Sequence, residues 1–228
     1  FMKPIWYLFY KEWIKTRTAF FCSLLVGVGV VFYIFIGVEN KITLMGAKNY
    51  TLNILYSNPP VIYYSLLRYL PLLAAVSIGI SQYVPEVSQR RIRLTLHLPV
   101  GNCTLFIGMA FYGLLLITIF NAIVLGFFLW KNSFIFPSEV TIPVRHTVWG
   151  WFLAGYWVYN YIAFTALEPN RLRQLFYALT GLIVLSLYFY DVPFHGAYGS
   201  STPVLALLAL LSCPLILFSG YRLNKGER

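Results

Sequence analysis

The sequence predicts an all-α polytopic membrane protein with six transmembrane helices. Hydrophobic residues make up 59% of the 228 residues and charged residues 11%, whereas a soluble domain carries about 25% charged residues. The apolar residues gather in six runs close to the length of about 20 residues that a helix needs to cross a bilayer. They do not alternate with polar residues as the strands of a membrane barrel do. We therefore expect one transmembrane domain over residues 1–228.

The segment at 4–17 precedes the first apolar run and predicts an N-terminal interfacial helix. Ile5, Phe9 and Trp13 recur at a spacing of four residues, so they share one face of a helix, and two lysines fall outside that stripe. Such a helix keeps its aromatic side chains at the acyl boundary and its lysines among the headgroups. The alternative is a plain cytoplasmic extension of the first span.

The predicted spans are residues 20–38, 61–84, 103–130, 147–167, 175–190 and 202–221. The first run is longer than the apolar region of a typical signal peptide, so we expect a span rather than a cleaved signal. Pro59 and Pro60 favour a turn or an extended approach to the second. The fourth carries tryptophans and tyrosines near both ends, as interfacial belts do. The fifth is the shortest, so the count of six depends on it.

Basic residues divide the connections between the spans into two groups. Twelve of the 17 lysines and arginines lie before the first span or after the second, fourth and sixth spans. By the positive-inside rule, both termini are cytoplasmic in a multi-pass protein of the cell inner (plasma) membrane. The net charge of +10 then serves orientation and contact with anionic lipid headgroups, and no nucleic-acid partner is expected.

The sequence lacks the motifs of several kinds of chemistry. No G-x-x-x-x-G-K-[ST] phosphate loop occurs, and the predicted spans contain no Asp, Glu or His. Proton-driven carriers and intramembrane metalloproteases normally need such side chains as relays or metal ligands. We therefore expect no catalytic residue, no metal site and no enzymatic activity in this chain.

A few polar residues inside the predicted spans are weak candidates for a substrate path. Arg68 lies about 10 Å inside the second span, where it either snorkels to the outer headgroups or meets an anion in a vestibule. Asn121 and Asn160 either hydrogen-bond across helices or contact substrate. Tyr156 either packs against a neighbour or lines a path for an amphipathic molecule.

The connection between the second and third spans predicts a short cytoplasmic helix. Pro85 and Glu86 suit its start, because proline needs no donor there and a carboxylate meets the positive end of the helix dipole. A Pro-Val-Gly sequence ends it. The second inner connection, at 168–173, is too short for such a helix. Only the first connection therefore offers a substantial docking surface, and its arginines are Arg90, Arg91 and Arg93.

Two short motifs resemble the membrane (permease) subunit of a type-two ABC exporter. One is Phe9-Tyr10-Lys11-Glu12-Trp13, which is similar to the family's N-terminal aromatic-Lys-Glu sequence. The other is Glu86 … Arg90-Arg91 … Thr95 … Leu98-Pro99-Val100, in which Leu94 stands where the family usually has glycine. The resemblance implies that the short cytoplasmic helix is a coupling helix, which docks into a groove on a separate ATPase.

The resemblance also implies partners and site residues. The expected ATPase-coupling residues are Glu86, Arg90, Arg91, Arg93 and Leu94. The partners are cytoplasmic ABC ATPase subunits, which bind ATP and Mg, and a second membrane subunit in a homodimer or heterodimer. This chain itself holds no cofactor. We expect ATP-driven export of an amphipathic or hydrophobic substrate.

Two other functions stay open. One is a non-transporting membrane scaffold that recruits a cytoplasmic partner through the same arginines, without a nucleotide-driven change in access to a cavity. The other is an intramembrane lipid enzyme, which would lose activity when its catalytic groups at the interface are replaced. The candidates for those groups are His97, His146, His195, Glu139 and Asp191.

Overall fold

The structure is a computed structural model that describes residues 2–88, 102–189 and 194–225. Within these ranges the protein consists of helices and loops and has no β-strand. The prediction of an all-α protein is confirmed. The elements are α1 (Met2–Met45), α2 (Ala47–Tyr56), the 3-10 helix η1 (Ser65–Tyr69), α3 (Leu70–Ser88), α5 (Asn102–Ile135), α6 (Ser138–Leu167), α7 (Arg171–Tyr188) and α8 (Thr202–Lys225).

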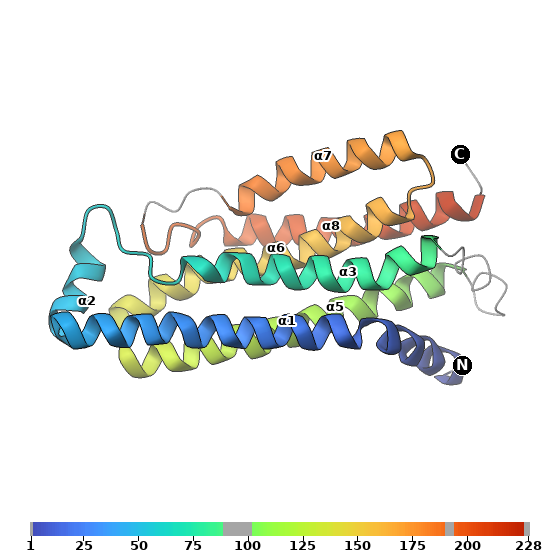
Figure 1. Cartoon of the computed structure of the whole chain (residues 1–228). Helices are drawn as coiled ribbons and strands as arrows, with labels where there is room; N and C mark the ends of the chain where they lie inside the picture. Colours follow the sequence, from blue (N-terminus) through green and yellow to red (C-terminus); the bar gives the residue numbers. More distant parts are fainter. Residues whose placement is uncertain (1, 89–101, 190–193, 226–228) are drawn as a thin grey trace.

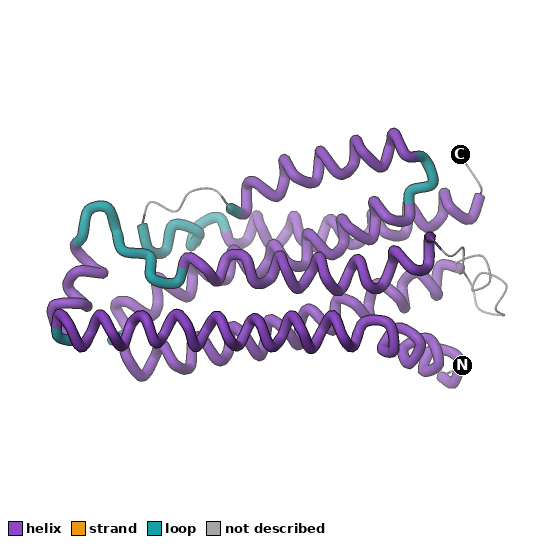
Figure 2. The backbone as a smooth tube through the Cα atoms, in the orientation of Figure 1, coloured by secondary structure: helices purple, strands orange, loops and turns teal. Residues whose placement is uncertain are grey.

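The long helices run alternately in opposite directions, so that both chain termini lie at the same end of the bundle (Figure 1). The loops are confined to the two ends (Figure 2). Helix α6 packs against α3, α5, α7 and α8, while α1 packs against α3 and α5 and α7 packs on α6. Helix α6 is therefore the centre of the bundle, and α1 and α7 lie on its periphery.

Four helical segments are long and apolar enough to cross a membrane: Trp6–Met45, Ser65–Ser88, Thr104–Ile135 and Thr202–Gly220. They contain most of the first, second, third and sixth predicted spans. Helices α6 and α7 do not meet the same standard of length and composition. Helix α6 carries buried tryptophan, tyrosine and asparagine side chains as well as aliphatic ones, which its central position in the bundle explains. The count of six spans stays a prediction.

Helix α1 is continuous over 44 residues, or about 66 Å. The segment at 4–17 and the first predicted span therefore belong to one helix, whose first turns bend away from the rest (Figure 1). A helix of about 20 residues suffices to cross the hydrocarbon core. Helix α1 thus extends beyond the core, and so does α5 with 34 residues.

The predicted helix start at Pro85 is wrong. Helix α3 continues through Pro85 and ends at Ser88. Helices in membranes tolerate proline because neighbouring groups satisfy the backbone atoms that it leaves free. Glu86 therefore belongs to the last turn of α3, and its side chain is buried. The rest of the predicted coupling helix falls on residues 89–101, which lie outside the described residues.

Helix α2 was not predicted. Gly46, with a φ of 81°, turns the chain between α1 and α2 in a conformation that favours glycine. Tyr50 and Ile54 are buried on one face of α2, and their spacing of four residues is the signal in the sequence that could have revealed the helix.

Candidate functional site

Four charged side chains meet between α1 and α3 at the end of the bundle that holds both termini. Lys15 Nζ lies 2.7 Å from Glu12 Oε1 and 2.8 Å from Glu86 Oε1. Lys11 Nζ lies 2.9 Å from the same oxygen of Glu86. Both glutamate side chains are 0% exposed, and that of Lys15 is 11% exposed. We call these four residues the ionic cluster.

The ionic cluster balances two buried carboxylates with two lysines. Removing an ion from water costs several kcal/mol unless close partners offset the loss. The second oxygens, Glu12 Oε2 and Glu86 Oε2, are buried and have no hydrogen-bond partner within the described part of the chain. The carboxylates therefore depend strongly on the lysines, and Lys15 is the one that touches both.

Helix geometry explains how the sequence builds the cluster. Positions 11, 12 and 15 are three or four residues apart or adjacent, so one side of α1 carries all three charges. Glu86 reaches them because α1 packs against α3. Glu86 also stands three residues before the segment 89–101. The cluster thus joins the first turns of α1 to the point where α3 leads into the arginine-containing segment.

A buried polar layer lies next to the ionic cluster. Thr16 Oγ1 lies 2.9 Å from the hydroxyl of Tyr112. Gln82 donates through Nε2 to the carbonyl of Met109 at 2.9 Å and accepts from the hydroxyl of Tyr159 at 2.8 Å. These bonds join α1 to α5, and α3 to both α5 and α6. They satisfy polar groups that would be costly to bury without partners.

Gly113 allows α5 to approach this layer closely. A Cβ atom at Gly113 would lie 1.9 Å from the hydroxyl oxygen of Tyr159 and 2.1 Å from the ring carbon that bears it. Tyr159 is fully buried and held by hydrogen bonds, so it has little room to move. Glycine is therefore required where α5 passes Tyr159.

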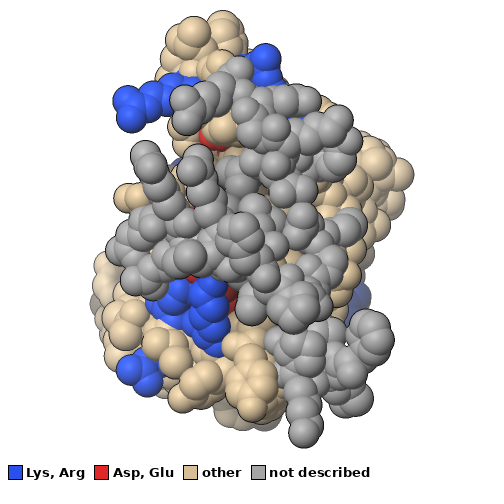
Figure 3. All heavy atoms as spheres, turned by 90° about the vertical axis from the view of Figure 1, so that its right-hand side faces the viewer, with Lys and Arg blue, Asp and Glu red and all other residues tan. Residues whose placement is uncertain are grey.

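A third buried carboxylate joins helices at the same end of the bundle. Glu168 follows α6, and its Oε2 lies 3.3 Å from Arg222 Nη1 on α8, while its Oε1 lies 4.0 Å from Arg173 Nη1 on α7. Lysine and arginine side chains gather on the described part of this face, with only small areas of acidic side chain visible (Figure 3). The acids here are buried, and much of the basic charge faces outward.

The predicted coupling residues divide into two groups. Arg90, Arg91, Arg93 and Leu94 lie outside the described residues, so their role stays a prediction. Glu86 is described and points into the ionic cluster rather than outward. Because its side chain is buried, Glu86 does not present its carboxylate at the surface.

Of the residues suggested for a substrate path, Arg68 lies outside the regular helix α3. It belongs to η1, and its guanidinium lies 4.7 Å from the centre of the Tyr69 ring. Nη2 donates a hydrogen bond to the Tyr69 hydroxyl. Arg68 thus lies just before the start of α3, whereas Glu86 of the ionic cluster lies in the last turn of that helix. A contact of Arg68 with substrate stays a prediction.

The other three suggested path residues connect helices to one another. Asn121 Nδ2 donates to the carbonyl of Phe152 at 3.4 Å. Asn160 Nδ2 donates to Ser212 Oγ at 2.7 Å, and Tyr156 donates to Thr118 Oγ1 at 3.1 Å. Each of the three thus bonds to a different partner. Their contacts account for them as links between α6 and its neighbours, and a role toward substrate stays a prediction.

Of the five groups suggested for a lipid enzyme, the structure describes three. His97 and Asp191 fall outside the described residues, and His146 and Glu139 are exposed on α6. His195 Nδ1 lies 2.9 Å from the hydroxyl of Tyr64. Among the described residues, no three His, Cys, Asp or Glu side chains form a group that could hold a metal ion.

The sequence alone does not predict the ionic cluster, because from it we expect Lys11 and Lys15 to contact the lipid headgroups. The signal was the scarcity of acidic residues: the chain has seven in all, and Glu12 lies within one helical turn of both lysines.

Comparison of the chain with protein-family models, curated proteins and solved structures finds no match. The function must therefore be argued from the site itself.

Proposed function

We propose that this chain is the membrane subunit of an ATP-driven exporter for an amphipathic or hydrophobic substrate. The observation that carries the proposal is the position of the ionic cluster. Glu86 ends α3 three residues before the segment 89–101 and is bound to Lys11 and Lys15 of α1. A force applied to that segment by a cytoplasmic ATPase would reach α1 through these ion pairs.

The proposal includes six membrane crossings, by α1, α3, α5, α6, α7 and α8. An even number of crossings agrees with two termini at one end of the bundle (Figure 1). Helix α6 has 30 residues, which is enough to cross, and its aromatic side chains are largely covered by other helices. Helix α7 has 18 residues, or about 27 Å, close to the thickness of the hydrocarbon core. The basic end then faces the cytoplasm of a cell whose inner membrane holds the protein.

In this mechanism the two groups of coupling residues have different tasks. Arg90, Arg91, Arg93 and Leu94 dock onto the ATPase, which binds ATP and Mg, and Glu86 passes the movement on to α1. ATP binding by the partner moves α3 and α1 together relative to the rest of the bundle and changes the access to a substrate cavity. A second membrane subunit, identical or different, completes the transporter.

The test uses the whole chain purified together with the products of its neighbouring genes and reconstituted in lipid. Replacing Arg90 and Arg91 together by glutamate should abolish ATPase binding, because it reverses the charge of the docking segment. Glu86→Gln should keep ATPase binding but lose most of the substrate-stimulated ATP turnover. Glu168→Gln is the matched control, because it removes a buried carboxylate at the same end of the bundle outside the proposed route.

The outcomes separate the proposal from the scaffold alternative. If no ATPase binds the chain, the proposal is wrong. If a partner binds through Arg90 and Arg91 but nucleotide changes neither α1 nor access to a cavity, the chain is a scaffold. If Glu86→Gln and Glu168→Gln lower ATP turnover equally, the ionic cluster is structural and does not transmit movement.

A further inference from the structure

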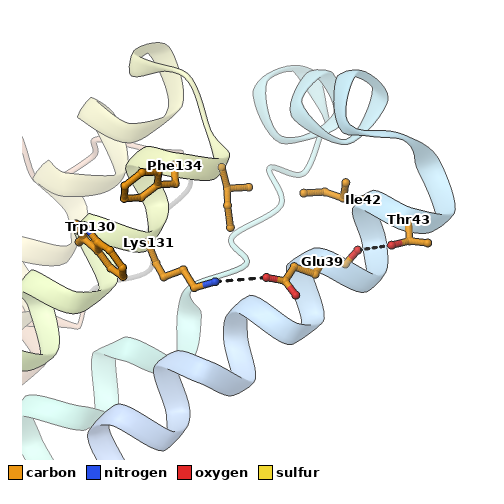
Figure 4. A pocket seen from close by; sticks show the side chains of 7 residues that line it. Glu39, Ile42, Thr43, Trp130, Lys131 and Phe134 are labelled. Atoms are coloured by element: carbon orange, nitrogen blue, oxygen red, sulfur yellow. Dashed lines mark hydrogen bonds and ion pairs between the residues drawn. The ribbon is translucent and has the colours of Figure 1, made fainter.

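A pocket lies between α1 and α5 at the end of the bundle opposite to the ionic cluster. Its volume is about 430 Å³, within the range of ligand sites in proteins. Figure 4 shows the side chain of Lys131 extending across the pocket toward Glu39, with Trp130 and Phe134 beside it on α5. The lining residues are Glu39, Ile42, Thr43, Trp130, Lys131, Phe134 and Ile135.

The depth of this pocket follows from the two helices that form it. The apolar runs at 20–38 and 103–130 end one residue before Glu39 and Lys131. On the bilayer side of the pocket, α1 and α5 are joined by aromatic contacts, with the ring centres of Phe35 and Phe128 5.6 Å apart. The pocket therefore begins where the hydrocarbon core gives way to the headgroups.

The charges in the pocket are loosely paired. Lys131 Nζ lies 3.5 Å from Glu39 Oε1, and the two side chains are 33% and 58% exposed. Exposed pairs of this kind contribute about 0–1 kcal/mol, so they separate at little cost. An ammonium has three N–H donors and a carboxylate has two accepting oxygens, so both groups can bind a further ligand.

We propose that this pocket binds the headgroup of a phospholipid that carries a phosphate and a primary ammonium, that is, a phosphatidylethanolamine. Lys131 donates hydrogen bonds to the phosphate, and Glu39 accepts them from the ligand's ammonium. Trp130 and Phe134 contact the glycerol region and the first methylenes of the acyl chains. Aromatic side chains at this depth are typical of membrane interfaces.

The charge pattern also determines which ligands bind poorly. An anionic lipid without an amine leaves Glu39 facing a phosphate of like charge. A quaternary ammonium, as in phosphatidylcholine, has no N–H to donate to Glu39, although it can contact the face of Trp130. A primary ammonium beside a phosphate is the combination that satisfies both side chains.

The test measures lipid binding to the detergent-purified whole chain by native mass spectrometry. Phosphatidylethanolamine, phosphatidylcholine and phosphatidylglycerol with identical acyl chains are compared with free phosphoethanolamine. We expect phosphatidylethanolamine to bind most tightly, and Glu39→Gln or Lys131→Gln to weaken it about tenfold each through loss of one charged hydrogen bond. Glu139→Gln and Lys48→Gln, which change exposed charges outside the pocket, should leave it unchanged.

A charge-reversed double variant separates ligand binding from folding. Glu39→Lys with Lys131→Glu keeps one charge of each sign in the pocket, and it should recover most of the binding lost by the single variants. Equal binding of phosphatidylcholine overturns the proposal, as does unchanged binding by both single variants. If free phosphoethanolamine binds as tightly as the lipid, the site takes a soluble zwitterion and the lipid assignment is wrong.

Discussion

The two ends of the bundle use ion pairs in opposite ways. In the ionic cluster, Lys15 lies 2.7 and 2.8 Å from two carboxylates that are fully buried. At the other end, Lys131 and Glu39 are 3.5 Å apart and both partly exposed. The first arrangement joins two helices tightly, and the second leaves both charges available to a ligand.

The difference follows from solvation. A buried carboxylate without its cation is strongly unfavourable, so the helices that carry the partners must move together. An exposed pair is screened by water and salt and places little constraint on its helices. Burial therefore ties together the helices that carry the ionic cluster, whereas exposure leaves the charges of the pocket between α1 and α5 available for binding.

The largest expected effect is on Lys15. Lys15→Met leaves Glu12 and Glu86 buried with Lys11 as the remaining lysine of the ionic cluster, so we expect a loss of about 3–5 kcal/mol in the free energy of unfolding. Denaturant unfolding of the purified chain in detergent micelles measures this loss. A loss no larger than that of Lys48→Met, which removes an exposed lysine, would contradict the account of the ionic cluster.

The next effect concerns Gly113, which lies beside the polar layer. Gly113→Ala places a methyl group against the fixed hydroxyl of Tyr159, and overpacking of this kind costs about 1–3 kcal/mol. Gly29→Ala is the matched control, because nothing lies within 4 Å of its added Cβ. Equal thermal midpoints for the two variants would show that Tyr159 moves aside freely.

The pair of Lys131 and Glu39 should have a small effect on stability. Lys131→Met removes a partly exposed cation, so we expect a change below about 1 kcal/mol in the same unfolding measurement. Paired with Lys15→Met, this variant compares burial directly at the two ends. Similar losses for the two lysines would remove the distinction between them.

The smallest expected effect is a pH dependence at His195, which lies in the loop 194–201. Burial lowers the pKa of His195 below its ordinary value of 6.5, and the nearby backbone of Ile54 opposes this in part. The folded state therefore holds this proton less readily than the unfolded state. The contribution to stability is present above pH 6.5 and declines as the pH falls below it.

Thermal unfolding at several pH values checks this prediction. The midpoint of the unmodified protein should fall more between neutral and mildly acidic pH than that of His195→Gln. Parallel curves for the two proteins would mean that His195 does not contribute. The Tyr64 hydroxyl lies 2.9 Å from Nδ1 of His195.

Much of the fold could be predicted because lipid demands apolar helices. The runs at 20–38, 103–130 and 202–221 all lie within helices of the structure. Helix ends were harder to predict, because α1 and α5 continue into polar sequence where lipid no longer selects the residues. Whether helix α6 crosses the membrane is difficult to predict for a different reason. Neighbouring helices rather than lipid surround much of it.

The candidate site could be predicted only in part. Glu86 was predicted at the start of the cytoplasmic helix and, through the resemblance, as a coupling residue, but its inward direction depends on α3 continuing through Pro85. The partnership of Glu86 with Lys11 and Lys15 spans more than 70 positions in the sequence, and helix periodicity contains no information about such a contact. The packing of α1 on α3 brings these residues together.

The most direct test of the central claim measures movement of α1 during the ATP cycle. Spin labels are placed at positions 7 and 172, which carry exposed residues on α1 and α7, in a chain whose three cysteines are replaced. Electron paramagnetic resonance then gives the distance between labels in the ATPase complex, with and without a non-hydrolysable ATP analogue. The account predicts that nucleotide changes the distance between the labels in the labelled chain and in its Glu168→Gln variant. In the Glu86→Gln variant this change should be lost. The same change in Glu86→Gln would contradict it.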